Sequence, residues 1–373
     1  MIKQFHESIQ KSLEELKITK LTPIQEQSIP KIMEGKNLVG LSETGSGKTL
    51  AFLIPAITQT IGLPKKDIKL LILTPTKELC SQIHTVVKKL SKYNQLLSVK
   101  ILGGDNPQEQ IRNVNKGVHI LVATPGRLQD HVIKEAIDLS QVDIVVLDEA
   151  DVMMDMGYHP QITDIVNACT GRKQTLLFSA TMNEEAKTLV DEFLGEHIII
   201  DINANQPKAA IEEYFCDIRN ELKIPFLKYL IKAEKIRAGL IFSNTKEGAK
   251  KIFEKLKEGQ YKVELIEGEM STHARKKALD RLKRKEVQFL VATDVASRGI
   301  DIPHITHIIN FEVPLNKDSY IHRIGRTARH EKSGKAFTLC QLDRDEKDIL
   351  RIKEEINLKK FKDFDYNMKL ARK

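Results

Sequence analysis

The eight residues from Ser42 to Thr49 read SETGSGKT and are of the types that bind a nucleoside triphosphate. Glycines let the backbone turn its amide N–H groups inward, Lys48 brings a point charge to the outer phosphates, and the Thr49 hydroxyl is a ligand for Mg²⁺. An apolar run from Leu38 to Leu41 precedes the segment, and a helix-compatible run from Leu50 to Ile61 follows it. A turn between a strand and a helix is the context that a phosphate loop requires. The sequence therefore predicts a phosphate-binding loop here.

A second motif, DEAD at Asp148 to Asp151, ends the most apolar run of the chain. Because ligands of parallel sheets bind at the carboxyl ends of the strands, these carboxylates are predicted to lie near the phosphates. Asp148 suits Mg²⁺, directly or through water, and Glu149 is placed to orient and deprotonate an attacking water. Acidic residues after a strand are also common helix N-caps, and the motif alone does not separate the two readings. The phosphate loop upstream favours catalysis.

The elements that must hold these motifs are short apolar runs separated by helical stretches. In the first half the further runs are Leu70–Thr74, Val99–Leu102, His119–Thr124, Asp143–Asp148 and Thr175–Ser179. Nearly every run is apolar throughout, which is typical of parallel strands buried on both faces. The predicted fold class is therefore α/β, with a doubly wound sheet.

The second half repeats this alternation after a polar stretch with a central proline, INANQPKAA. Its strand candidates are EEYFCDI, AGLIFS, KVELIE, QFLVAT, HIIN and KAFTLC, and it has no glycine-rich phosphate loop of its own. We expect a first domain at residues 1–202, a linker at 203–210 and a second domain at 211–373. The second domain is expected to end in a charged helix and a basic tail. Two sheets with one phosphate loop predict a ligand in the cleft between the domains.

The composition of the chain bounds its class. A length of 373 residues fits two domains of roughly 150 to 200 residues, and the formal charge of +8 favours a polyanionic partner. The four cysteines have no paired spacing, which indicates a reducing compartment and ordinary thiols. No apolar run is long enough to cross a bilayer, and the N-terminus lacks a secretory signal. We expect a soluble, cytoplasmic monomer with no membrane partner.

Both motifs, with LTPIQ at Leu21–Gln25, SAT at Ser179–Thr181 and HRIGRTAR at His322–Arg329, resemble the DEAD-box family of ATP-dependent RNA helicases. The resemblance is specific because spaced motifs match in the right order over nearly the whole chain. It implies two tandem RecA-like domains, each a mostly parallel sheet with helices on both faces. It also implies that ATP and RNA close the domains, so that short RNA duplexes separate locally or RNA–protein complexes are remodelled, and that hydrolysis resets the cycle.

The same resemblance assigns the nucleotide site, with ATP and Mg²⁺ as its ligands. Gln25 reads adenine, since its side-chain amide both donates and accepts. Asp301 contacts the ribose, and Arg326 and Arg329 are arginine fingers that stabilise charge on the γ-phosphate. The loop residues that hold the phosphates are Ser42, Thr44, Gly45, Ser46, Gly47, Lys48 and Thr49.

The segment before Gln25 departs from the family pattern. The usual Gly, aromatic and Pro positions hold Lys17, Ile18 and Leu21, so the stacking of adenine is left open. Ile18 is a candidate apolar lid. Phe5 resembles the family's isolated upstream phenylalanine, or it anchors the core.

RNA is assigned by the resemblance to turns after strands and to helix N-termini, where amides and hydroxyls suit phosphate oxygens. The contacts of the first domain are Pro75, Thr76, Lys77, Gly103, Gly104, Thr124, Pro125, Gly126 and Arg127. Those of the second domain are Ser243, Asn244, Arg275 and Thr293. Coupling of hydrolysis to strand separation falls to Asp151, Ser179, Thr181 and His322. Ribosomal RNA or a ribosome precursor is the suggested target.

Two other classes of protein remain open at this point. One is an ATP-dependent RNA clamp or scaffold with slow turnover, and the other is a related motor that acts on DNA. The presence of Glu149, Arg326 and Arg329 counts against the clamp, and the DEAD and SAT forms count against the DNA motor.

Overall fold

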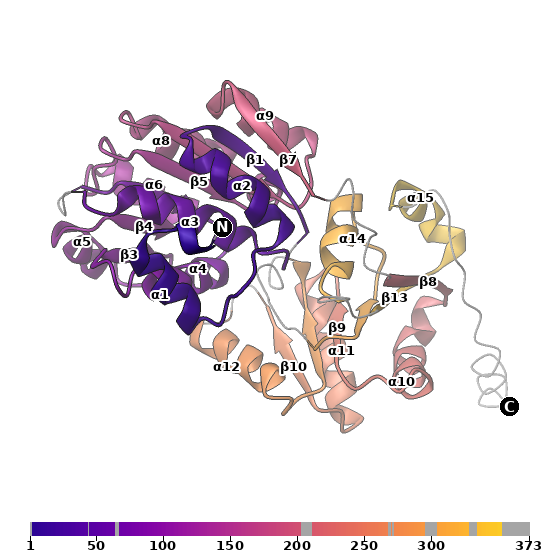
Figure 1. The fold of residues 1–373 in the computed structure, drawn as a ribbon. Helices are drawn as coiled ribbons and strands as arrows, with labels where there is room; N and C mark the ends of the chain where they lie inside the picture. The colour runs from indigo at the N-terminus through magenta and orange to yellow at the C-terminus, as the bar shows by residue number, and fades with distance from the viewer. Residues whose placement is uncertain are drawn as a thin grey trace, which may run out of the picture. The chain divides into compact units, whose positions relative to one another are not determined.

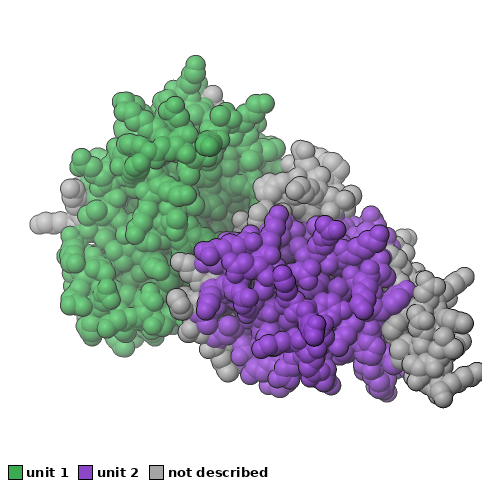
Figure 2. Space-filling view, turned by 90° about the horizontal axis from the view of Figure 1, so that it is seen from below, with its two compact units in different colours: residues 1–206 green, residues 207–373 purple. Residues whose placement is uncertain are grey.

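The chain divides into two compact units, Met1–Gln206 (unit 1) and Pro207–Lys373 (unit 2), coloured separately in Figure 2. The computed structural model describes residues 2–43, 45–63, 67–202, 211–267, 270, 272–294, 304–327 and 334–352. Thr44, Asp301 and Arg329 lie outside the described residues, as do the predicted linker and the predicted basic tail.

Unit 1 is built on a seven-stranded sheet in which every neighbouring pair is parallel, in the order β3-β4-β2-β5-β6-β1-β7 (Figure 1). Its strands are β1 (Asn37–Leu41), β2 (Leu70–Leu73), β3 (Ser98–Ile101), β4 (Ile120–Ala123), β5 (Ile144–Asp148), β6 (Gln174–Ser179) and β7 (His197–Asp201). The predicted α/β class is confirmed. Strand β7 was not predicted. It is an edge strand, and Ile199 within it is 60% exposed.

Helices cover both faces of this sheet because successive strand side chains point to opposite sides. The α-helices of unit 1 within the described residues are α1 (Glu7–Glu15), α2 (Pro23–Met33), α3 (Lys48–Thr60), α4 (Lys77–Leu90), α5 (Pro107–Asn115), α6 (Pro125–Ile133), α7 (Ala150–Asp155), α8 (His159–Ala168) and α9 (Glu184–Phe193). Leu38 packs in the core formed with α1 to α4, whereas its neighbour Val39 packs in the core formed with α6 to α9.

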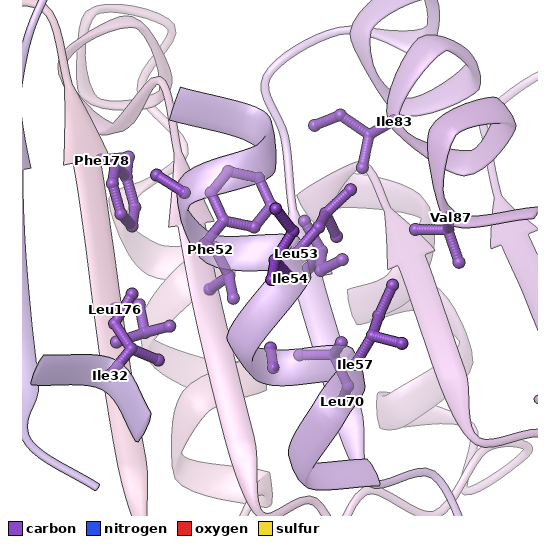
Figure 3. Close-up of a cluster of buried hydrophobic side chains, with 14 of the residues drawn as sticks. Ile32, Phe52, Leu53, Ile54, Ile57, Leu70, Ile83, Val87, Leu176 and Phe178 are labelled. Carbon is purple, nitrogen blue, oxygen red and sulfur yellow. The ribbon is translucent and has the colours of Figure 1, made fainter. Parts of the chain in front are cut away.

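Helix α3, which starts at the phosphate loop, is held by the first of these cores. Figure 3 shows Phe52, Leu53, Ile54 and Ile57 of α3 among side chains of the sheet and of α4. The Phe52 ring lies 5.2 Å, between centroids, from the ring of Phe178 in β6. This packing fixes the start of α3 against the ends of the strands.

Unit 2 is built on a six-stranded parallel sheet in the order β10-β11-β9-β12-β13-β8. Its strands are β8 (Ile211–Asp217), β9 (Gly239–Phe242), β10 (Val263–Ile266), β11 (Phe289–Ala292), β12 (His307–Asn310) and β13 (Gly334–Cys340). Its helices within the described residues are α10 (Lys223–Ala233), α11 (Lys246–Glu258), α12 (Thr272–Lys283), α14 (Lys317–Ile324) and α15 (Leu342–Ile352). Every strand predicted for this half is present.

The cysteines are ordinary core thiols, as predicted. Cys80, Cys169, Cys216 and Cys340 are all buried and free. Burial raises the pKa of the Cys80, Cys169 and Cys340 thiols to about 12, so they stay neutral near pH 7. In the part of the chain that the structure describes, no helix combines the length and the apolar character that crossing a membrane requires.

Candidate functional site

The phosphate loop lies between the end of β1 and the start of α3, as predicted. Gly45 and Gly47 have φ angles of 91° and 99°, in the left-handed region that favours glycine. A Cβ atom at Gly47 would lie 2.4 Å from Gln25 Nε2 and 2.8 Å from Thr22 Oγ1, so no larger residue fits without rearrangement. The loop therefore needs glycine at position 47 for both conformation and space.

The ammonium group of the loop lysine is hydrogen-bonded within the loop. Lys48 is buried, and its Nζ donates a hydrogen bond of 2.6 Å to the carbonyl oxygen of Ser42. Ser42 is fully buried, and its hydroxyl lies 2.7 Å from that of Ser46. A small polar residue at position 42 thus closes the loop on itself, and a phosphate would compete with a carbonyl for the ammonium group. Thr49, on the first turn of α3, is half-buried.

The acidic motif lies at the end of β5, on the same edge of the sheet. Asp148 is 3% exposed, and its burial, together with the neighbouring charge of Glu149, raises its pKa to about 7, although Lys48 opposes the shift. Glu149 has a φ of 54° and precedes α7, and its Oε2 is buried with no hydrogen-bond partner among the described residues. Buried carboxylates with one lysine nearby suit a divalent cation, since Mg²⁺ prefers oxygen ligands and relieves their repulsion.

Gln25 is bound to the phosphate loop within the protein. Its Oε1 accepts from the amide of Thr22 at 3.0 Å, and its Nε2 donates to the carbonyl oxygen of Gly47 at 3.0 Å. The first bond belongs to a capping box at the start of α2, and the second ties that helix to the loop. Reading adenine would require the amide to exchange these partners for the base.

The residues around the unusual LTPIQ segment pack into the core. Phe5, Ile18 and Leu21 are partly buried against the core formed with α1 to α4. Lys17 has a φ of 57°, which explains why glycine is usual at this position. The position of Phe5 agrees with a core anchor.

The SAT segment is tied to the acidic motif by hydrogen bonds between the ends of β5 and β6. The Asp151 carboxylate accepts from the Thr181 amide and hydroxyl, both at 2.9 Å, and from the Ala180 amide at 3.2 Å. The Ser179 hydroxyl accepts from the Asp151 amide at 3.3 Å. A movement of either strand end would therefore be transmitted to the other.

The predicted RNA residues of unit 1 lie together because β3, β4 and β2 are adjacent strands. Thr76 caps α4 by accepting from the Leu79 amide at 3.3 Å, and Lys77 begins that helix. The Lys77 Nζ lies against the Gly103–Gly104 turn, 3.2 Å from where a Gly104 Cβ would stand. The residues in the turns after these strands, or in the helical turns that follow, are Pro75, Thr76, Lys77, Gly103, Gly104, Thr124, Pro125, Gly126 and Arg127.

Arg127 links the third of these turns to the second. Its Nη1 donates a hydrogen bond of 3.0 Å to the carbonyl oxygen of Asp105, which follows the glycine pair. Thr124 is the N-cap residue of α6 and Pro125 is its first residue. The helix N-termini and the glycine turn thus bring backbone amides and two cationic side chains, those of Lys77 and Arg127, to one edge of the sheet.

Unit 2 is organised at the same edge of its sheet by Arg323, a residue to which the sequence motifs assigned no role. Its guanidinium donates to both Asp294 carboxylate oxygens, with Nη2 at 2.7 Å from Oδ2, and also to Asn244 Oδ1 at 2.7 Å. Arg323 is 1% exposed, and its Nη1 lies 3.4 Å from Asn310 Oδ1. It also lies over the Phe242 ring, 5.2 Å from the ring centroid. This one side chain thus joins the ends of β9, β11 and β12.

The other predicted residues of unit 2 lie around this cluster. Ser243 and Asn244 follow β9 and both donate to the carboxylate of Glu312, at 3.4 Å from the serine hydroxyl and 3.1 Å from the backbone amide of Asn244. Thr293 follows β11 and is barely exposed. The remaining predicted residues are His322 on α14, Arg326 buried in the turn after it, and Arg275 on α12.

Comparisons with known proteins agree with the motifs. Residues 22–189 match the DEAD/DEAH box helicase family, and residues 222–331 match the helicase conserved C-terminal domain. The DEAD-box ATP-dependent RNA helicase RhpA of Helicobacter pylori is 37% identical over 352 residues, which cover 94% of this chain and 71% of RhpA. The chain belongs to the DEAD-box family. It is therefore an ATP-dependent RNA helicase, and its resemblance to that family is confirmed.

Further DEAD-box relatives support the same fold and activity. The ATP-dependent RNA helicase CshA of Listeria monocytogenes is 37% identical over 355 residues, covering 95% of this chain and 68% of CshA. Dbp5 of S. cerevisiae bound to RNA and ADP BeF3 matches with a TM-score of 0.84 at 25% identity, covering 99% of this chain and 97% of Dbp5. Mss116p bound to ssRNA and AMP-PNP matches with a TM-score of 0.82 at 27% identity, covering 98% of this chain and 80% of the Mss116p chain. The two units are thus tandem RecA-like domains of a DEAD-box ATPase that uses a nucleotide and binds RNA.

Proposed function

We propose that unit 1 holds Mg²⁺ and ATP at the edge where β1 and β5 end, and that unit 2 completes the site when RNA is bound. The observation that carries this proposal is the buried cluster of Lys48, Asp148 and Glu149, in which a lysine and two carboxylates follow the ends of parallel strands. The fold does not require two buried carboxylates at this place, and they fit the binding of a metal–phosphate group.

Residues of the loop exchange partners when the nucleotide binds. Lys48 leaves the Ser42 carbonyl oxygen for the outer phosphates, and the amides of the glycine loop turn toward them. Thr49 and Asp148 would hold Mg²⁺, with Asp148 acting partly through water. When bound, the metal neutralises charge on the phosphate oxygens. Gln25 exchanges its bonds to Thr22 and Gly47 for the adenine edge.

Glu149 is the proposed general base. Its Oε2 has no hydrogen-bond partner among the described residues, so it is available to orient a water and take its proton. Arg326 and Arg329 would supply positive charge to the γ-phosphate, and Asp301 would contact the ribose. Arginine fingers accelerate such reactions by about 10³ to 10⁵, so a site completed by unit 2 would be strongly gated.

RNA is the proposed trigger for this completion. The turns after β2, β3 and β4, called the RNA turns of unit 1, would hold the RNA backbone. In unit 2 the backbone would be held at Ser243–Asn244, Arg275 and Thr293. Contacts to the backbone favour sequence-independent binding. Closure would separate short duplexes locally or remodel RNA–protein complexes, with Asp151, Ser179, Thr181 and His322 relaying the change. Hydrolysis would then reset the cycle.

The wider setting is also proposed. Residues 1–202 and 211–373 would be the two domains and 203–210 their linker. The chain would act as a monomer in the cytoplasm, on ribosomal RNA or its precursors. The free thiols of the buried cysteines agree with a reducing compartment.

The test is ATP hydrolysis by the purified chain alone, with RNA and with DNA, measured beside Lys48→Ala and Glu149→Gln. We expect RNA to stimulate the wild type while DNA does not, and both variants to lose the stimulated rate. Retention of ATP-dependent RNA binding in Glu149→Gln would show that the catalytic step alone was lost. A wild-type rate that RNA leaves at the level of both variants would instead favour the slow clamp.

A further inference from the structure

A hollow of about 550 Å³ lies along β3, at the edge of the unit 1 sheet. Helix α4 contributes His84 and Lys88 to its lining, and the other side is formed by α5 and the residues that flank this helix. Strand β3 pairs with β4 alone among the described strands, so its outer side faces this hollow. None of the nucleotide or RNA motifs lines it.

Three lysines and two acidic residues, Asp105 and Glu109, line the hollow and leave it with a net positive charge. Lys88 and Lys116 are exposed and Lys100 is half-buried, and none of them forms an ion pair with a described carboxylate. Their nearest polar contacts are weak, with 3.4 Å between Lys100 Nζ and Ser81 Oγ and 3.4 Å between Lys116 Nζ and Asn113 Oδ1. Surface lysines without acidic partners are available to a polyanion.

One end of the hollow reaches the RNA turns of unit 1. Asp105 lines the hollow and directly follows the Gly103–Gly104 turn, and its carbonyl oxygen accepts from Arg127. Lys77 lies against the same glycine turn. A chain held at that turn would therefore have a continuous path into the hollow.

We propose that RNA flanking the segment held by the RNA turns runs along β3 between α4 and α5, with its phosphates bound by Lys88, Lys100 and Lys116. This inference rests on the proposed function of the RNA turns, and it adds a second RNA-binding surface that the helicase motifs do not include. Asp105 and Glu109 also line the hollow, near the glycine turn, and their charges oppose the binding of phosphates there.

A peptide strand added to the edge of β3 fits the structure less well. Strand addition uses the outward backbone groups of an edge strand. The His84 Nε2 atom lies 3.3 Å from the carbonyl oxygen of Ser98 and 3.2 Å from its hydroxyl, so the side chain of α4 already engages part of that edge. The unpaired lysines are better matched by phosphates than by a backbone ladder.

The test compares a long oligouridylate with one short enough to fill only the RNA turns, both bound to the full chain with a non-hydrolysable ATP analogue. In a Lys88→Gln, Lys100→Gln, Lys116→Gln variant, we expect affinity for the long RNA to fall on the order of tenfold at physiological salt. The slope of log affinity against log salt should become shallower by about 2, at roughly 0.7 for each of the phosphates released. Binding of the short RNA should be unchanged.

A matched control removes three lysines that form surface ion pairs elsewhere on unit 1, namely Lys11, Lys31 and Lys187. This control has the same net charge as the first variant and should bind long RNA as the wild type does. Asp105→Asn with Glu109→Gln should act in the opposite direction and strengthen binding of the long RNA. Wild-type affinity for long RNA in the three-lysine variant, with the short RNA still stimulating hydrolysis, overturns this inference alone. No stimulation of the wild type by either RNA overturns the proposed function as well.

Discussion

Asp148 in unit 1 and Asp294 in unit 2 occupy similar places and have opposite surroundings. Each lies at the carboxyl end of an interior strand of its sheet, β5 or β11. Asp294 is neutralised by the guanidinium of Arg323, which is itself buried. Asp148 is buried beside Glu149, and Lys48, the nearest cation, is bonded to a carbonyl oxygen.

At the strand ends of unit 2 the buried charge is balanced by the protein itself, whereas at those of unit 1 it is balanced only when a ligand binds. In unit 2 the protein supplies both charges, so the three strand ends are fixed whether or not RNA is present. In unit 1 Asp148 is buried beside Glu149, and burial together with the charge of Glu149 raises the pKa of Asp148 to about 7, although Lys48 opposes the shift. The nucleotide-free unit 1 is therefore destabilised at the place where Mg²⁺ and ATP are proposed to bind.

Removing the internal cation of unit 2 should have the largest effect on stability. Arg323→Met leaves Asp294 and two asparagines without their shared donor, and we expect a loss of about 3 to 5 kcal/mol in the free energy of unfolding of unit 2. Urea unfolding of the whole chain, followed by probes in each unit, measures the loss. Lys255→Gln, which removes an exposed pair with Glu258, is the control and should cost less than about 1 kcal/mol. A loss no larger than that of the control would contradict the role given to Arg323.

Removing the charge of Asp148 should instead stabilise the nucleotide-free protein. The native pKa of about 7 lies above the unfolded value near 3.9, so the native state of the wild type loses stability as the pH rises from about 4 through 7. Asp148→Asn escapes this loss. We expect the variant to gain stability over the wild type on the order of 2 kcal/mol at pH 8, and much less at pH 5.

Urea unfolding at both pH values measures this gain. The exposed Asp130→Asn change serves as a control and should give the same small difference at pH 5 and pH 8. An Asp148→Asn variant that is less stable than the wild type at pH 8 would show that a cation within the protein already compensates this carboxylate.

Weakening the link between β5 and β6 should have the smallest effect. Thr181→Val removes one hydroxyl donor from the Asp151 carboxylate, while the amides of Ala180 and Thr181 remain. We expect unit 1 to lose about 1.5 kcal/mol, which is typical for a hydrogen bond to a charged group. Thr188→Val, which removes an exposed hydroxyl bond within α9, should change stability by less than about 0.5 kcal/mol. An equal loss of stability in the two variants would show that the Asp151 carboxylate does not link β5 to β6.

The sequence predicted the fold well because its strands are buried on both faces. A strand such as β2, which reads LLIL and is buried at every position, must be apolar throughout, and such runs are visible without a structure. Strand β7 was missed although Ile198 to Ile200 form an apolar run; it is an edge strand, and the run is bounded by His197 and Asp201. The glycine loop and the acidic motif were found for a related reason, since the carboxyl ends of parallel strands meet at one edge.

The internal partners of the site could not be predicted. Arg323 and Arg326 are three residues apart in one motif, and spacing does not reveal that Arg323 is bonded to Asp294 at the ends of the strands. Gln25 was predicted to bind adenine, but its bonds to Thr22 and Gly47 depend on how α2 packs on the loop. These contacts arise from tertiary packing between segments far apart in the sequence.

The central claim is that unit 1 binds the phosphates and unit 2 supplies the charge that completes catalysis. The most direct measurement is the rate of ATP hydrolysis by Arg326→Ala at saturating RNA, with ATP affinity measured in parallel. The account predicts that ATP still binds while the RNA-stimulated rate falls by roughly 10³-fold or more. A variant that hydrolyses ATP at the wild-type stimulated rate would contradict it.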